Sequence, residues 1–72
     1  MPDLRLFDRR VRKDLKALEK EGARLRVIDG GHVLLYPPGG GPTLKIAASR
    51  SAEQTRHFLR KQFAEPNGLA LP

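Results

Sequence analysis

The stretch that decides the fold is ARLRVIDGGHVLLY, residues 23–36. In its first half Leu25 and Val27 alternate with arginines, and this period-2 pattern predicts a strand over 23–29 with one apolar side. The dipeptides Asp29-Gly30 and Gly30-Gly31 both tolerate positive φ, so either of them can form the two-residue turn of a hairpin. The second half, residues 32–36, then predicts an antiparallel second strand.

This second strand is apolar on both sides, because Val33 and Leu35 point one way and Leu34 and Tyr36 the other. Such a strand is usually central in its sheet. With either turn, unbroken pairing places the even-numbered residues of the second strand beside Leu25 and Val27. The sequence leaves open which face of the sheet is covered.

An amphipathic helix is predicted before the hairpin, over residues 7–21. Its apolar side chains recur at helical spacing, at Phe7, Val11, Leu15 and Leu18. Asp8 suits the start of the helix dipole and Lys20 its end. Gly22 is the expected stop, because glycine adopts the left-handed conformation without penalty.

A third strand and a second helix are predicted after the hairpin. The run PPGGGP, residues 37–42, must be a loop, and residues 43–47 form a strand with Leu44 and Ile46 inward and Lys45 outward. Ser51 and Gln54 fit a capping box that opens a helix, and Pro66 ends it. The face expected to be shared in this helix consists of Thr55, Phe58, Leu59, Gln62 and Phe63.

The expected architecture is therefore an α+β fold of order α-β-β-β-α, a three-stranded antiparallel sheet with two helices on one face. A chain of 72 residues supports one domain, placed at 1–66, and we expect 67–72 to be a loosely ordered tail. A domain of this size has no room for an enclosed cofactor cavity, and we expect no cofactor.

The composition points to an anionic partner. Fourteen Lys and Arg against eight Asp and Glu give a formal net charge of +6, which is typical of a nucleic-acid-binding domain. The chain has no cysteine, and no cluster of His, Asp and Glu offers a metal site, so none is expected. With neither a membrane-spanning segment nor an apolar leader in the sequence, we expect a cytoplasmic protein without membrane contact.

His32 is the candidate for chemistry, since a histidine can act as general base or acid near neutral pH. Its alternative role is that of a hairpin-end residue with a backbone hydrogen bond. The candidate RNA-binding residues are cations that could hold phosphates, or could be ordinary exposed charges. On the strands they are Arg24, Arg26 and Lys45, and on the second helix they are Arg56, Arg60 and Lys61.

Residues 11–63 resemble the HicA-type (YcfA-like) toxin family. The stretch Gly30-Gly31-His32-Val33-Leu34-Leu35-Tyr36-Pro37-Pro38 corresponds to the family's glycine turn, histidine, apolar strand, aromatic residue and proline. Gly31 stands where the family usually has serine, and Pro37 where it has histidine. The resemblance implies a fold like that of double-stranded-RNA-binding domains and cleavage of messenger RNA without a metal. It also implies that His32 is the catalytic residue and that a HicB-type antitoxin is the partner.

Two other functions are compatible with the same residues. The fold could bind nucleic acid through its basic surface without any chemistry. It could also act on a host protein, as small phage or plasmid proteins do, through the doubly apolar second strand.

Overall fold

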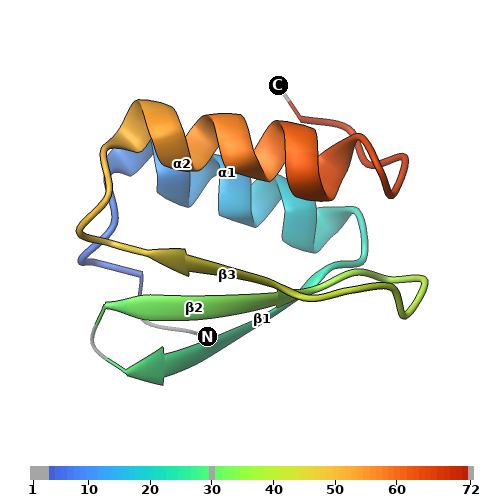
Figure 1. Ribbon diagram of the computed structural model, residues 1–72, viewed down its shortest axis with the longest axis horizontal. Helices are drawn as coiled ribbons and strands as arrows, with labels where there is room; N and C mark the ends of the chain where they lie inside the picture. Colours follow the sequence, from blue (N-terminus) through green and yellow to red (C-terminus); the bar gives the residue numbers. More distant parts are fainter. Residues whose placement is uncertain (1–3, 30, 72) are drawn as a thin grey trace.

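The computed structural model describes residues 4–29 and 31–71 and has the expected order of elements. These are α1 (Arg9–Lys20), β1 (Arg24–Asp29), β2 (His32–Tyr36), β3 (Leu44–Ala47) and α2 (Ala52–Phe58), which continues as a π-helical segment, η1 (Leu59–Ala64). The strands form one antiparallel sheet in the order β1-β2-β3. Both helices lie on the same face of this sheet (Figure 1), so the predicted α+β fold is confirmed.

Three parts of the sequence predictions lie outside the described residues. They are the start of the chain at residues 1–3, the middle of the hairpin turn at Gly30, and the last residue of the expected tail, Pro72. Within the described part of the chain, no helix is long and apolar enough to cross a membrane.

Both ends of α1 are capped: Gly22 ends the helix as predicted, whereas Asp8, expected only to suit the helix dipole, lies just before the helix. Asp8 is the N-cap, and its Oδ1 accepts a hydrogen bond from the backbone N–H of Arg10 at 2.8 Å. This bond, together with the Arg10 guanidinium, holds the pKa of Asp8 below its ordinary value. At the other end Gly22 has a φ of +103°, and the N–H of Ala23 donates to the carbonyl of Leu18 at 3.0 Å. The helix therefore stops where glycine allows the chain to turn toward β1.

The predicted register of the hairpin is wrong. Asp29 pairs with His32, but Val27 pairs with Val33 and Leu25 with Leu35, because the register shifts at Ile28. The extra residue is a β-bulge, which moves the odd-numbered residues of β2 beside the apolar side of β1. Leu25, Val27, Val33 and Leu35 thus share one face, whereas Leu34 points the other way and Ile28 remains 47% exposed.

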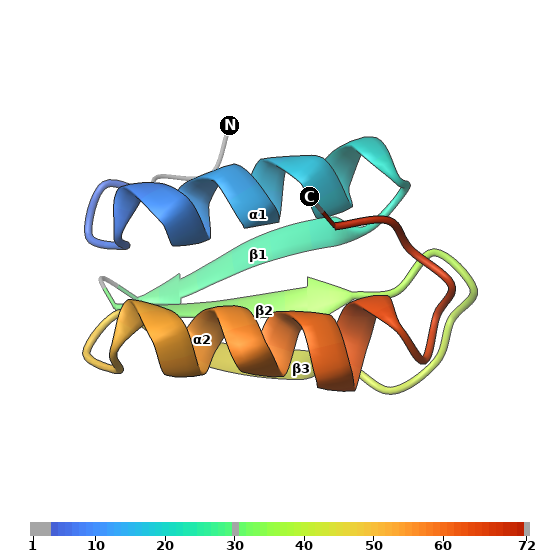
Figure 2. The same cartoon turned by 90° about the horizontal axis from the view of Figure 1, so that it is seen from above.

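The core lies between that face of the sheet and the two helices. Seen from above, α1 runs on the β1 side of the sheet and α2 over β3 (Figure 2). The buried apolar side chains come from every layer of the fold: Leu4, Phe7, Val11, Leu15, Leu18, Ala23, Val33, Leu35, Ile46, Leu59, Phe63 and Ala64. The predicted inward positions Leu44 and Ile46 also face this core, and Lys45 is exposed.

The second helix starts as predicted but buries a different set of side chains. The Oγ of Ser51 accepts from the N–H of Gln54 at 3.2 Å, which confirms Ser51 as the N-cap. Thr55, Leu59 and Phe63 are buried, but Gln62 is exposed, so its predicted place on the inner face is wrong. The wider π-helical turns of η1 rotate Ala64 inward, and Gln62 falls at the margin of the helix beside the edge strand β3.

The segment after η1 returns to the body of the domain. The N–H of Ala70 donates to the Glu21 carboxylate at 3.0 Å, and Leu69 and Leu71 pack against the core. The Nδ2 of Asn67 donates to the carbonyl of Phe63 at 2.8 Å. Residues 67–71 therefore contact both helical elements.

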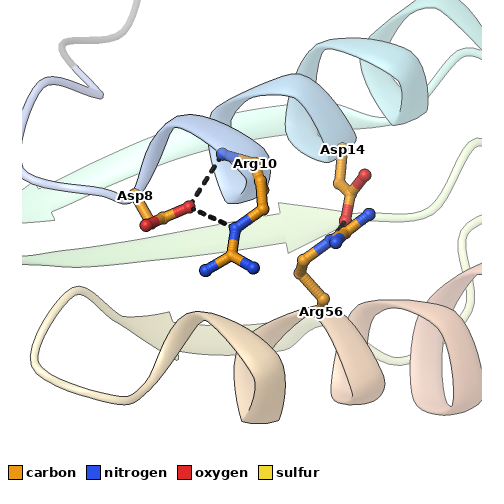
Figure 3. Close-up of polar contacts among 4 residues, drawn as sticks. All are labelled: Asp8, Arg10, Asp14 and Arg56. Carbon is orange, nitrogen blue, oxygen red and sulfur yellow. Dashed lines mark hydrogen bonds and ion pairs between the residues drawn. The ribbon is translucent and has the colours of Figure 1, made fainter.

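An ion pair joins the two helices. The Nε of Arg56 on α2 donates to Oδ2 of Asp14 on α1 at 2.9 Å, and the Asp14 side chain is only 3% exposed (Figure 3). This bond and the negative charge of Asp14 raise the pKa of Arg56 above its ordinary value. The second pair in Figure 3, Asp8 with Arg10, has the same chemistry but is exposed on both sides.

The assignment of sheet faces predicts unequal effects for two neighbouring leucines. Leu35→Ala removes a fully buried side chain and should lower the free energy of unfolding by about 3 kcal/mol. Leu34→Ala acts on the open face and should lower it by less than about 1 kcal/mol. Urea unfolding followed by circular dichroism measures both values, and equal losses would contradict the observed register.

The two ion pairs predict a second contrast. Arg56→Gln leaves the buried Asp14 carboxylate without its cation and should clearly lower the free energy of unfolding. Arg10→Gln removes only the exposed pair and should lower it much less. The double variant Asp14→Leu, Arg56→Met should recover most of the loss. Equal small losses in the two single variants would contradict a structural role for the Asp14–Arg56 pair.

Candidate functional site

The face of the sheet that the helices leave open carries the predicted catalytic residue. We call it the open face. Cross-strand pairing arranges its side chains in three rows: Asp29, His32 and Ala47; then Arg26, Leu34 and Lys45; then Arg24 and Tyr36. Successive rows are about 7 Å apart, which is the advance of two residues along a strand. Alternation along β2 with the buried Val33 directs His32 away from the core, and the bulge at Ile28 places Arg26 and Arg24 on the same face.

His32 and Asp29 form a side-chain pair at the first row. Nδ1 of His32 lies 2.8 Å from Oδ1 of Asp29, and the same oxygen accepts from the N–H of Gly31 at 2.9 Å. The carbonyl of Gly31 in turn accepts from the N–H of Ala48 at 2.7 Å, which ties the hairpin end to the end of β3. Hydrogen bonds therefore hold the hairpin end that carries His32, while the His32 side chain remains 40% exposed.

The pair determines which ring nitrogen can do chemistry. The N–H of Gly31 and the His32 side chain hold the pKa of Asp29 below its ordinary value, so the carboxylate is ionised near neutral pH. An ionised carboxylate only accepts hydrogen bonds, so Nδ1 of His32 must be the donor. In neutral His32 the lone pair is then on Nε2, which is available to take a proton from a ligand on the open face.

Cations lie beside His32 on the two neighbouring strands. Arg26 and Lys45 flank Leu34 in the second row, so each is a diagonal neighbour of His32, within reach of a long side chain. Arg24 lies one row further, opposite Tyr36. Arg24, Arg26 and Lys45 are exposed, and none forms an ion pair with a carboxylate among residues 4–29 and 31–71. This leaves their positive charge free for an anionic ligand.

The predicted cations of the second helix lie elsewhere. Arg56 is committed to Asp14, and Lys61 pairs with Glu65 at 3.2 Å. Arg60 is exposed on the same helical layer. The structure therefore brings two of the six predicted RNA-binding residues, Arg26 and Lys45, next to His32. Arg24 lies further along the open face, and the other three lie across the sheet from His32. Charge reversal at Arg56 would disturb the contact between the helices rather than report on RNA binding.

Three features of the molecule were not found by sequence reasoning. Asp29 was assigned only to the turn, although its spacing of three residues from His32 across a glycine turn is a usable signal. Tyr36 was assigned only to a strand, and its position opposite Arg24 depends on the bulge. The third feature is a shallow hollow of about 260 Å³ on the outer side of α1, lined by Arg9, Arg12, Lys13 and Lys16.

Comparisons with known proteins identify no relative of this chain. The resemblance to HicA-type toxins rests on the residues of the hairpin and the following elements, and its implications stay predictions. No protein-family model, no curated protein and no solved structure matches this chain.

Proposed function

We propose that this protein is an endoribonuclease of the HicA type that cleaves single-stranded messenger RNA without a metal, with His32 as its catalytic residue. The observation that carries the proposal is the His32–Asp29 pair, 2.8 Å apart, at the end of an open face with unpaired cations. Bases in unpaired RNA are accessible to such a surface, whereas those of a duplex are not. The proposal places the protein in the cytoplasm, where its substrate is found.

The proposed reaction is an internal transesterification. Nε2 of His32 takes the proton of a ribose 2′-hydroxyl, and the 2′-oxygen forms a bond to the adjacent phosphorus. The bond from phosphorus to the 5′-oxygen of the next nucleotide breaks, and that oxygen receives a proton from the imidazolium or from water. The products are a 2′,3′-cyclic phosphate and a free 5′-hydroxyl, so no oxidant or additional reactant is needed.

The cations of the second row support the same chemistry. The phosphate gains negative charge on its non-bridging oxygens as the 2′-oxygen attacks, and fixed cations lower the free energy of that state. Lys45 and Arg26 approach from opposite sides of His32, and we assign Lys45 to the cleaved phosphate and Arg26 to its neighbour. A HicB-type antitoxin that covers the open face would block both binding and cleavage.

The first test compares the two histidines of the chain. His32→Gln should abolish RNA cleavage, with a loss of at least about 10²-fold, because proton transfer by a positioned side chain contributes this much. His57→Gln is the matched control, since His57 is exposed on α2 in the helical layer, and it should retain wild-type activity. Purified protein is incubated with single-stranded RNA in excess chelator, and the products are analysed for the cyclic phosphate.

Other results of the histidine test would point to a different function. Cleavage that persists in His32→Gln would contradict the proposal. RNA binding that weakens steeply with salt but produces no cleavage in any variant would favour the nucleic-acid-binding module instead. Growth arrest on expression with RNA intact in both variants would favour a host protein as the target.

A second test concerns Asp29 as a positioning residue. Asp29→Ala should lower kcat by about 10–10²-fold with little change in KM, because the imidazole loses its orientation rather than its contact with substrate. Asp29→Asn keeps a carbonyl oxygen that can accept from Nδ1 and should retain more activity than Asp29→Ala.

The tautomer of His32 distinguishes positioning from a general loss of structure. In ¹⁵N NMR spectra the neutral ring of His32 should carry its proton on Nδ1 in the wild type and lose this preference in Asp29→Ala. A wild-type ring protonated on Nε2, or a tautomer that is the same in both proteins, would contradict the assigned role of Asp29.

A further inference from the structure

A groove opens at the end of the sheet opposite to His32. Its volume is about 640 Å³, and its lining comes from the α1–β1 turn, the start of β1, the end of β2 and the loop after β2. The residues that matter most for recognition are Arg24, Arg26, Tyr36 and Pro38. We call it the Tyr36 groove.

The loop wall of the Tyr36 groove is held in place by close packing. A Cβ atom on Gly22 would lie 3.2 Å from Cβ of Pro38, so the loop rests directly against the turn after α1. Pro37 is buried, and its carbonyl accepts from the N–H of Gly40 at 3.2 Å. A groove with walls fixed in this way loses little conformational entropy when a ligand enters it.

The chemistry of the lining selects the ligand. Tyr36 is half-buried and lies opposite Arg24 in the pairing of β1 with β2, so an aromatic ring and an unpaired guanidinium border the same space. Aromatic side chains stack on nucleobases, and arginine binds the phosphates that link them. A base is free to enter such a groove only when it is unpaired.

We infer that the Tyr36 groove binds one unpaired base of single-stranded RNA, stacked on Tyr36, with an adjacent phosphate on Arg24. The inference rests on the proposed function and deepens it. Tyr36 and His32 are four residues apart on β2, or about 13 Å. The bound base therefore belongs to a nucleotide further along the strand than the cleaved phosphate, and the groove determines where the RNA lies relative to His32.

Tyr36 itself is a reporter for this inference, because it is the only tyrosine of a chain without tryptophan. The His32→Gln variant keeps the RNA whole during the measurement. It is titrated with a single-stranded oligoribonucleotide and, separately, with an abasic ribose-phosphate oligomer of equal length. Stacking should quench the corrected fluorescence of Tyr36 with the first probe and leave it unchanged with the second.

Substitutions in the groove give an independent measurement of affinity by fluorescence anisotropy with a labelled oligoribonucleotide. Tyr36→Phe keeps the aromatic face and should change Kd by less than about 3-fold, whereas Tyr36→Leu should raise it by about 10-fold. Arg24→Gln should raise Kd several-fold, and Lys13→Gln, which removes one charge from the outer side of α1, should raise it much less.

The results that would overturn the inference are distinct. Equal quenching by both probes, or no quenching by either, would show that no base stacks on Tyr36. Equal effects of Arg24→Gln and Lys13→Gln would show that binding depends on overall charge alone. Binding of an acidic peptide such as oligoglutamate as tightly as RNA of equal charge would assign the groove to a protein ligand.

The inference and the proposed function fail in different ways. Cleavage of RNA by the wild type without quenching at Tyr36 would overturn the groove and leave the catalytic role of His32 intact. Quenching by the base-containing probe without cleavage would overturn the catalytic role and leave the groove as a binding site for RNA.

Discussion

The structure depends on which residues of β2 face the helices. Val33 and Leu35 are fully buried against α1 and α2, so His32, Leu34 and Tyr36 must face the other way. A shift of one residue in register would bury a histidine and expose two core side chains. The bulge at Ile28 secures the observed register on the β1 side, and the pairing of Val33 with Ile46 secures it on the β3 side.

The packing of the two helices stabilises this arrangement, and one arginine of α2 is needed for it. Asp14 is buried among the apolar side chains of α1, and a buried carboxylate without a partner is costly. Arg56 satisfies it from α2, which links the two helices above the sheet. The cations of the open face have no comparable carboxylates beside them within the described residues, except for Asp29, which is engaged by His32. Folding therefore separates structural charges from available ones.

Most of the fold could be predicted from local signals, whereas the site could be predicted only in part. The caps at Ser51 and Gly22 and the alternation of Leu25 and Val27 follow from short-range preferences. The bulge at Ile28 has no such signal, because it reconciles the turn with the packing of two strands against the helices. The role of Asp14 could not be predicted either. The sequence shows only one charge among many on this helix, and its burial and its pairing with Arg56 follow from the packing of the two helices.

The exposed cations lie in two groups, on the outer side of α1 and on the open face. The outer side of α1 carries four cations around a shallow hollow, and the open face carries three more beyond the sheet. Positive potential on both sides raises the encounter rate with any polyanion, but it does not distinguish one site from another. Among residues 4–29 and 31–71, only the open face combines unpaired cations with an aromatic ring and a histidine held by a carboxylate. In the proposed function, charge on α1 attracts the RNA, and recognition and cleavage take place on the open face.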